Sequence, residues 1–229
     1  MLRANPGVVV SWSVVNWVTA MGGAGEPTAA EIAALFGKAA EHWHAVHAID
    51  RSRAARLLAG RRVVRDLVTG GQPVRWAGFE PTPPMRKPAL ADSDLDFSIA
   101  HSGKWLLAAI VAAGQVGVDI EVHNTEFDHP GLIRRMCTVT ELETARSLYG
   151  RPRRAWLARL WTAKEAVAKL TGHGLRQDFR LLELGQHVRV DDATGPIAAS
   201  IATRATADTT QLTVRQPDIR QQQAVGVAR

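Results

Sequence analysis

Cysteine is almost absent from this chain, and its scarcity excludes several kinds of protein. Among 229 residues the one cysteine is Cys137, so neither an intramolecular disulfide nor a cysteine-ligated zinc finger can form. Apolar runs are short, and none approaches the roughly 20 residues of a membrane-spanning helix. Polar residues interrupt the apolar N-terminus and no cleavage site follows, so we expect a strand and a loop there, not a signal peptide. Together these absences predict a cytoplasmic protein that does not bind membranes.

Acidic residues are outnumbered by basic ones. The chain has 28 Lys and Arg against 22 Asp and Glu, which gives a net charge of +6. Such a balance indicates either a polyanionic partner or no particular partner. The basic residues concentrate at 51–65 and 146–159, not in a tail, and no finger or aromatic RNA-binding signature accompanies them. The charge pattern therefore does not favour nucleic acid over other polyanions.

Hydrophobic periodicity predicts an α+β pattern in which helices are followed by short strands, twice. A capping box at Thr28–Glu31 opens a helical stretch to about residue 47, and an arginine-rich helix runs from residue 50 or 52 to Gly70. Strands are expected at 95–99, 105–112 and 116–122. In the second half we expect helices at 132–136, 141–149 and 153–169, and strands at 181–184, 187–190, 198–202, 211–214 and 223–227.

Two carboxylates stand two residues apart in the apolar strand at 116–122. On a strand, Asp119 and Glu121 point to the same face, about 7 Å apart. Glu165 and Lys169 are four residues apart in the helix at 153–169 and share a face. Taken alone, each pattern is typical of a solvated surface. Two acids in an apolar strand are costly unless a cation offsets them, so if Glu165 meets this pair the three would suit Mg²⁺.

Four collinear motifs resemble the 4′-phosphopantetheinyl transferase superfamily. They are Arg86-Lys87-Pro88, the strand and turn at 97–105 with His101-Ser102-Gly103, the segment 117–121 and the helix 161–169. Their order and spacing resemble the larger, monomeric branch typified by surfactin synthetase-activating enzymes. The resemblance implies two similar α/β halves, 1–113 and 114–229, related by pseudo-two-fold symmetry. Each half would be a helical part packed on a small antiparallel sheet, with coenzyme A bound between them.

The resemblance also implies a reaction. Members of this family transfer the phosphopantetheine arm of coenzyme A to a serine of an apo acyl or peptidyl carrier protein, and adenosine 3′,5′-bisphosphate leaves. Asp119, Glu121 and Glu165 match the family's metal-binding acids, which would hold Mg²⁺, or Mn²⁺ in its place. The implied partners are anionic coenzyme A and an acidic carrier protein, not nucleic acid or membrane. Both fit the basic charge of the chain.

Further matches concern proton transfer and the pyrophosphate. Lys169 matches the lysine that contacts the pyrophosphate, and with Glu165 and Glu141 it completes the catalytic set that the resemblance implies. Glu141 matches a candidate base for the carrier serine, although it could equally offset the dipole of the helix that it begins. Lys164 is a second candidate for the pyrophosphate, with surface solvation as the alternative, because it is turned about 100° from Glu165.

The nucleotide side of coenzyme A has its own set of matching residues. In the helix at 51–65 Arg51 and Arg53 are alternatives to Arg56, because the arginine-rich run allows shifts of register. The resemblance implies contacts to coenzyme A from Arg56, Arg86, Lys87, Pro88, His101 and Ser102.

Other functions remain open at this point. Clustered acids on a basic surface would also serve a Mg²⁺-dependent phosphodiesterase or nuclease. A basic nucleic-acid-binding module would bind DNA with a steep salt dependence and be indifferent to Asp119. A degenerate family member would bind coenzyme A without transferring anything, and two departures from the family pattern, Ala100 and Met136, keep that reading open.

Overall fold

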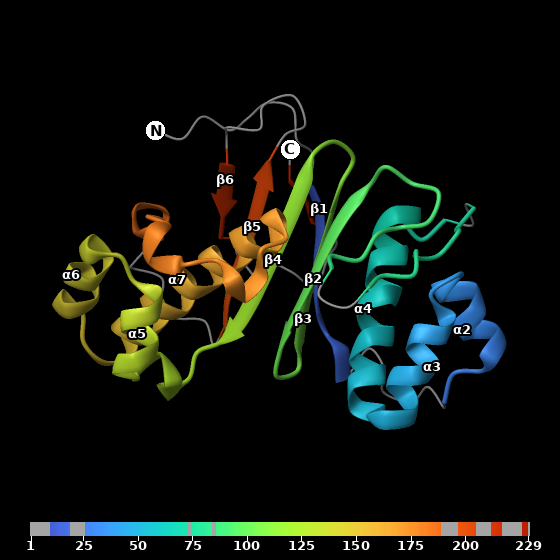
Figure 1. Ribbon diagram of the computed structural model, residues 1–229, viewed down its shortest axis with the longest axis horizontal. Coiled ribbons are helices and arrows are strands. Elements are labelled where there is room, and N and C mark those ends of the chain that lie inside the picture. Colours follow the sequence, from blue (N-terminus) through green and yellow to red (C-terminus); the bar gives the residue numbers. More distant parts are fainter. Residues whose placement is uncertain are drawn as a thin grey trace.

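The computed structural model describes residues 10–18, 26–72, 75–83, 86–188, 197–204, 212–216 and 226–228. It is a mixed α+β fold in which two small antiparallel sheets lie side by side, with helices α2–α4 beyond one sheet and α5–α7 beyond the other (Figure 1). The first sheet has the order β2-β3-β1-β7 and the second β4-β5-β6. The strands are β1 (Val10–Asn16), β2 (Asp96–Ser102), β3 (Trp105–Val111), β4 (Gln115–Val122), β5 (Ile197–Arg204), β6 (Leu212–Arg215) and β7 (Gly226–Ala228).

Local signals place the ends of the longest N-terminal helix, but they do not place the break between the two helices before it. Helix α4 (Arg51–Thr69) is capped by the Asp50 carboxylate and ends at a left-handed Gly70, as predicted. The helical stretch predicted up to residue 47 is instead two helices, α2 (Ala29–Phe36) and α3 (Ala40–Ile49). The break falls at Gly37, whose φ is 56° and whose added Cβ would lie 2.4 Å from the Ala77 carbonyl oxygen, so only glycine fits there.

The C-terminal helices follow the prediction, but part of the tail does not. They are α5 (Pro130–Met136), α6 (Val139–Ser147) and α7 (Gly150–Thr171), and a single 3₁₀ turn, η1 (Thr125–Asp128), precedes them. Three more 3₁₀ turns follow α7: η2 (Gly174–Arg176), η3 (Phe179–Leu181) and η4 (Gly185–His187).

The strand predicted at 181–184 is wrong. The segment leaves a 3₁₀ turn as an irregular loop, and the N–H groups of Leu184 and Gly185 donate to the Glu141 carboxylate, not to a strand. The strand predicted at 187–190 begins in η4, and its last two residues lie outside the described residues. The strands predicted at 198–202, 211–214 and 223–227 correspond to β5, β6 and β7 where the chain is described.

A long helix packs against each sheet. Helix α4 covers the β1–β3 sheet, and α7 covers β4 and β5, with separate apolar clusters on the two sides. A third cluster, which includes Leu107, Val118 and Ile201, lies between the sheets. At Gly117 in β4 the approach of α7 is so close that an added Cβ would lie 1.9 Å from the Ala166 carbonyl oxygen. The glycine therefore sets how near the end of α7 comes to β4.

The two sheets meet along a seam of side chains. Strands β2 and β4 are neighbours but belong to different sheets, and three β2 side chains accept hydrogen bonds from β4 backbone N–H groups. The pairs are Asp96 with Val116, Ser98 with Val118, and Ser102 with Val122. From the other end of the chain, β7 pairs with β1. The two parts of the chain are thus joined at a row of specific polar contacts.

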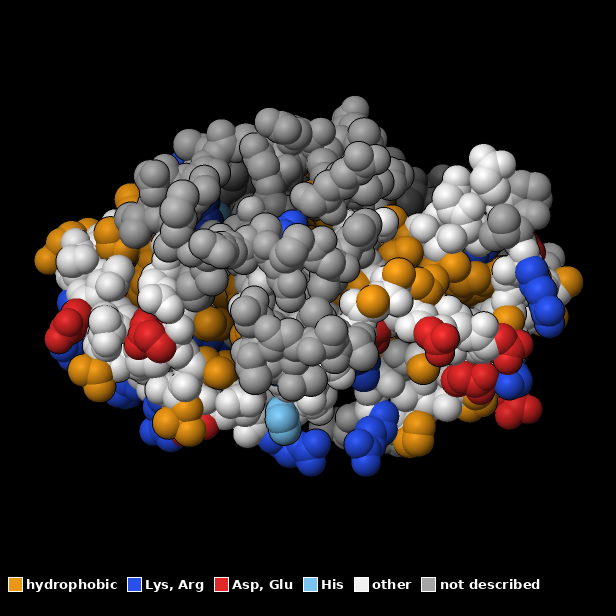
Figure 2. All heavy atoms as spheres, turned by 90° about the horizontal axis from the view of Figure 1, so that it is seen from above, with side chains coloured by type: hydrophobic (Ala, Val, Ile, Leu, Met, Phe, Trp, Pro, Cys, Tyr) orange, Lys and Arg blue, Asp and Glu red, His pale blue; other side chains and the backbone are white. Residues whose placement is uncertain are grey.

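The hydropathy of the helices and the distribution of surface charge give one observation each. None of the helices in the described ranges is both long and apolar enough to cross a membrane. On the face shown in Figure 2, acidic and basic side chains are interspersed over the described part of the surface. Among the described residues of that face, basic side chains do not form one broad patch.

Candidate active site

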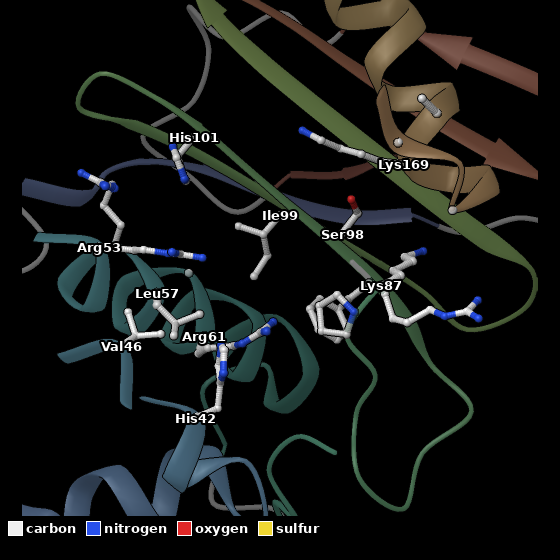
Figure 3. A pocket seen from close by; sticks show the side chains of 18 residues that line it. His42, Val46, Arg53, Leu57, Arg61, Lys87, Ser98, Ile99, His101 and Lys169 are labelled. Atoms are coloured by element: carbon white, nitrogen blue, oxygen red, sulfur yellow. The ribbon is translucent and has the colours of Figure 1, made fainter. Parts of the chain in front are cut away.

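A pocket of about 370 Å³ opens where α4, β2, the turn at 86–88 and the end of α7 meet. Figure 3 shows labelled side chains of α4, β2 and α7 around one space, with Lys87 at its edge. Six residues predicted from the sequence line it: Arg56, Arg86, Lys87, Pro88, His101 and Lys169. The sequence motifs, which are spread over more than 110 residues, are therefore brought to one place.

Positive charge surrounds this pocket. Burial lowers the pKa of His101, and the nearby charges of Arg56 and Lys169 lower it further. Arg53, one of the alternatives to Arg56, lines the pocket as well, whereas Arg51 is not among the residues that line it. Cations from two different helices thus face a common space, which is the arrangement expected for a ligand that carries several negative charges.

Arg61 lines the same pocket and was missed by the sequence analysis. Its guanidinium lies over the rings of Phe79 and Phe97, 4.4 and 5.1 Å from their centroids, and burial lowers its pKa to about 10. Within the described residues no ion pair joins it to a carboxylate. The helical spacing of Arg53, Leu57 and Arg61, each four residues apart on one face of α4, could have identified it.

Lys87 forms part of the pocket wall. Its Nζ donates to Asp96 and, at 2.7 Å, to the carbonyl oxygen of Val116. Desolvation lowers the pKa of Lys87, while the Asp96 carboxylate opposes this shift. Because Asp96 also accepts from the Val116 N–H at 2.8 Å, Lys87 ties the 86–88 turn to the seam between β2 and β4.

The three predicted metal ligands lie at the end of α7 and along β4. The side chain of Asp119 is 7% exposed; its Oδ1 accepts from Lys169 Nζ at 2.6 Å, and its Oδ2 is buried without a partner. Burial raises the pKa of Asp119 to about 6, although Lys169 opposes the shift. Glu165 Oε1 is likewise buried without a partner.

The three acids are close enough to act on one another. Burial is the main cause that raises the pKa of Glu121 and of Glu165. In addition, the charge of Glu165 raises the pKa of Asp119, that of Asp119 raises the pKa of Glu121, and that of Glu121 raises the pKa of Glu165. Three mutually repelling carboxylates and the single lysine Lys169 leave a net negative charge that a bound cation would offset.

This donor set fits a divalent cation. In the part of the chain that the structure describes, no three His, Cys, Asp or Glu side chains are already arranged as a metal site. The two partnerless oxygens, on Asp119 and Glu165, are nevertheless hard carboxylate donors, and the Glu165 charge is near enough to raise the pKa of Asp119. Carboxylate oxygens are the ligands that Mg²⁺ and Mn²⁺ prefer.

Glu141 and Lys164 lie away from the pocket, in a buried ion pair. Their side chains are 1% and 0% exposed, and Lys164 Nζ donates to Glu141 Oε2 at 2.5 Å. The same amine donates to the carbonyl oxygens of Met136 and Phe179 at 2.8 and 2.7 Å. Neither of the two alternatives weighed for Lys164, pyrophosphate binding or a solvated surface, matches this position.

The Glu141 carboxylate is as fully engaged as the amine. It closes the capping box of α6 by accepting from the Thr138 N–H at 2.8 Å, and it accepts from Leu184 and Gly185 at 2.9 Å each. Its role as a base remains a prediction, and in this structure every oxygen that would take a proton is held by the protein itself.

Ser102 does not line the pocket either. Its hydroxyl donates to Glu121 Oε2 at 2.7 Å and accepts from the Val122 N–H at 3.2 Å. Of the residues predicted to contact coenzyme A, Ser102 and Lys164 are therefore the two that do not line the pocket.

Comparison with known proteins adds an independent finding. Residues 115–225 match the family model described as the 4′-phosphopantetheinyl transferase superfamily. This part of the chain is similar to that superfamily. It contains the three acids and both lysines of α7, so the resemblance to the superfamily is confirmed for the motifs at 117–121 and 161–169.

Named members of the superfamily resemble the chain over part of their length. The 4′-phosphopantetheinyl transferase HetI of Nostoc is 31% identical over 52% of this chain and 53% of its own. The 4′-phosphopantetheinyl transferase psf-1 of Bacillus pumilus is 30% identical over 62% of this chain and 64% of its own. A 4′-phosphopantetheinyl transferase of Bacillus subtilis is 33% identical over 38% and 37%. The chain thus spans less than two thirds of each of these curated relatives.

Proposed function

We propose that this protein transfers the 4′-phosphopantetheine arm of coenzyme A to a serine of an apo acyl or peptidyl carrier protein. The products are the holo-carrier protein and adenosine 3′,5′-bisphosphate. The observation that carries the proposal is the cation-lined pocket that ends, at Lys169, beside the buried acids Asp119 and Glu165. This combination suits a phosphate-rich ligand whose reacting bond lies next to a divalent cation.

The chemistry needs no nucleophile from this chain. The carrier serine oxygen forms a bond to the phosphorus that bears pantetheine, the pyrophosphate bond breaks, and the serine proton passes to a base. Asp119, Glu121 and Glu165 would hold Mg²⁺ or Mn²⁺, which would neutralise charge on the phosphate oxygens. Lys169 supports this role, because its amine already lies 2.6 Å from Asp119 and also lines the pocket.

We propose that the nucleotide end of coenzyme A binds to the wall of the pocket opposite Lys169. Arg56 and His101 lie together at the pocket, and the Arg56 Nε is buried without a partner, so a ligand phosphate would complete its hydrogen bonding. Arg86 and Pro88 extend that wall, and Lys87 supports it from within.

Several finer features are proposed along with the reaction. We place the protein in the larger branch of the superfamily, as a monomer with two halves, 1–113 and 114–229, related by pseudo-two-fold symmetry. One long helix on one small sheet in each half, α4 and α7, supports that division. A single buried Cys137 suits a reducing compartment, so we propose that the enzyme works in the cytoplasm.

Intact-mass spectrometry of a carrier protein tests the reaction. A purified apo acyl carrier protein and an apo peptidyl carrier protein are each incubated with the enzyme, coenzyme A and Mg²⁺. We expect each competent carrier to gain the mass of one phosphopantetheine arm, and Asp119→Ala to lose most of this activity while keeping its fold. Glu143→Ala, which removes an exposed acid on α6, is the matched control and should remain active.

Failure would have a definite meaning. If neither carrier gained mass while a phosphodiester substrate were hydrolysed in the presence of Mg²⁺, the protein would be a phosphodiesterase. If coenzyme A bound with no transfer to any carrier, the chain would be a degenerate member of the superfamily. Either result would overturn the proposed transfer.

A further inference from the structure

Ser102 stands at the point where the seam between the sheets meets the acidic cluster. It is the last residue of β2, and its hydroxyl contacts β4 twice, at the Val122 N–H and at the Glu121 carboxylate. A serine hydroxyl has one hydrogen to donate and two lone pairs that accept. Because Val122 N–H can only donate, it uses a lone pair, and the hydroxyl hydrogen is left for Glu121 Oε2 at 2.7 Å.

The other seam residues lack this second contact. Ser98 accepts from the Val118 N–H at 3.1 Å, and no hydrogen bond joins its hydroxyl to a carboxylate in the described part of the chain. Ala100, between Ser98 and Ser102 on the same face of β2, has no hydroxyl at all. Among these alternating positions, Ser102 is thus the residue that connects the seam to one of the three acids.

The Glu121 side chain can adopt several rotamers, and a hydrogen bond from Ser102 would restrict them. Its side chain has several rotatable bonds and is half-buried, whereas Asp119 beside it is shorter and nearly fully buried. A half-buried glutamate without a partner would sample several rotamers. It would therefore lose conformational entropy each time it bound a cation. The Ser102 hydroxyl removes part of that cost in advance.

We propose that Ser102 is a positioning residue that holds Glu121 as the third carboxylate of the cation site. The inference rests on the cation site of the proposed function, and it assigns Ser102 a role other than contact with coenzyme A. Residues that orient metal ligands typically change metal affinity by about 10- to 100-fold when they are removed.

Mn²⁺ binding in the absence of coenzyme A tests the inference directly. Titrations followed by electron paramagnetic resonance compare the wild type with Ser102→Ala, Ser102→Thr and Ser98→Ala. We expect Ser102→Ala to weaken Mn²⁺ binding about tenfold. Ser102→Thr, which keeps the hydroxyl, should restore the affinity, and Ser98→Ala, which loses a seam hydrogen bond but no carboxylate contact, should leave it unchanged.

A double variant separates positioning from a general effect on the fold. If Ser102 acts through Glu121, then Ser102→Ala should weaken Mn²⁺ binding no further in a Glu121→Gln background. Equal losses in Ser102→Ala and Ser98→Ala, or an additive loss in the double variant, would overturn the inference. Urea unfolding of every variant shows that the proteins compared are folded.

The outcome is distinguishable from failure of the proposed function. A wild type that modifies carriers, combined with Ser102→Ala that binds Mn²⁺ like the wild type, would refute the role of Ser102 and leave the transfer reaction standing. A wild type that binds no Mn²⁺ would refute the role of Ser102 as well, and the carrier assay would then decide on the reaction by itself.

Discussion

Asp119 carries an unusual charge for its surroundings. It lies in an apolar strand with its side chain 7% exposed, and Lys169 compensates only one of its oxygens. Burial raises its pKa from 3.8 to about 6 even so. The folded protein therefore holds a proton on Asp119 at a pH where the unfolded chain has already released it.

This shift predicts a pH-dependent stability. Between about pH 4 and 6 the folded state binds more protons than the unfolded state, so the free energy of unfolding falls as the pH rises through this window. The rise of the Asp119 pKa from 3.8 to about 6 corresponds to a loss of about 3 kcal/mol in the free energy of unfolding across this window. Asp119→Asn cannot titrate, so its stability relative to the wild type should rise by about that amount from pH 4 to 7.

Urea unfolding without divalent cations at four pH values checks this expectation. Asp66→Asn, which makes the same exchange at an exposed position on α4, serves as the control for replacing an aspartate by asparagine. A pH-independent difference between Asp119→Asn and the wild type would show that burial does not perturb the Asp119 carboxyl.

At the scale of elements, the contact between β4 and α7 depends on one missing side chain. An added Cβ at Gly117 would meet the Ala166 carbonyl oxygen at 1.9 Å and the Leu170 N at 2.5 Å, and both are backbone atoms that cannot rotate away. Gly117→Ala should therefore destabilise the protein by about 3 kcal/mol, the upper range for overpacking. It should also weaken transfer, because α7 carries Glu165 and Lys169.

A matched glycine gives the control for this variant. At Gly60 in α4 an added Cβ would meet the ends of the Ile99 and Leu106 side chains at 3.2 to 3.4 Å, which can shift. In urea unfolding, Gly60→Ala should cost much less stability than Gly117→Ala. Equal losses would mean that the β4–α7 approach is not fixed by the glycine.

A second contact between elements is the Lys164–Glu141 pair. It joins α7 to the ends of α5 and α6 and to the segment 179–185, with both side chains fully buried. Lys164→Met should cost about 3–5 kcal/mol, because it leaves the Glu141 charge buried without a cation. Glu141→Gln added to this variant should recover part of the loss, since no uncompensated charge then remains.

The free energy of unfolding, not activity, is the measurement for this pair. The loss is expected whether or not Glu141 also serves as a base, so the two questions stay separate. If Lys164→Met cost less than about 1 kcal/mol, the value of an exposed pair, the buried pair would not hold these elements together.

At the scale of the whole molecule, a net charge of +6 meets a pocket lined by cations from both parts of the chain. Binding of coenzyme A should therefore weaken as salt screens these charges, by about tenfold between 50 and 500 mM NaCl. Isothermal titration calorimetry at several salt concentrations measures this slope. Arg56→Met should lower the affinity and flatten the slope, because it removes one cation from the pocket.

Arg65 provides the matched control on the same helix. It does not line the pocket and its guanidinium pairs with Asp66 at the surface, so Arg65→Met should leave the affinity for coenzyme A nearly unchanged. If both arginine variants weakened binding equally, the overall charge of the protein would decide the affinity, not the pocket. Competition by duplex DNA, with the same steep salt dependence, would instead support a nucleic-acid-binding function.

The sequence by itself determined most of the elements and the residues on which the proposed chemistry rests. Caps at Asp50 and Gly70 delimit α4 because they act within a few residues, and alternation of apolar residues identifies β3 and β4 for the same local reason. The four motifs located the pocket wall and the three acids. The break at Gly37 was not predicted because it depends on a segment distant in the sequence, whose Ala77 carbonyl oxygen packs against Gly37.

Only the tertiary structure decided what each polar side chain does. Lys164 and Lys169 stand five residues apart on α7, yet one closes a buried ion pair and the other reaches Asp119 at the pocket. The segment 181–184 has a strand-like sequence, but the N–H groups of Leu181 and Leu182 donate within a 3₁₀ turn and that of Leu184 donates to Glu141. Such outcomes depend on groups that are distant in the sequence, because the free energy of a buried charge or N–H group is set by the partner that folding brings to it.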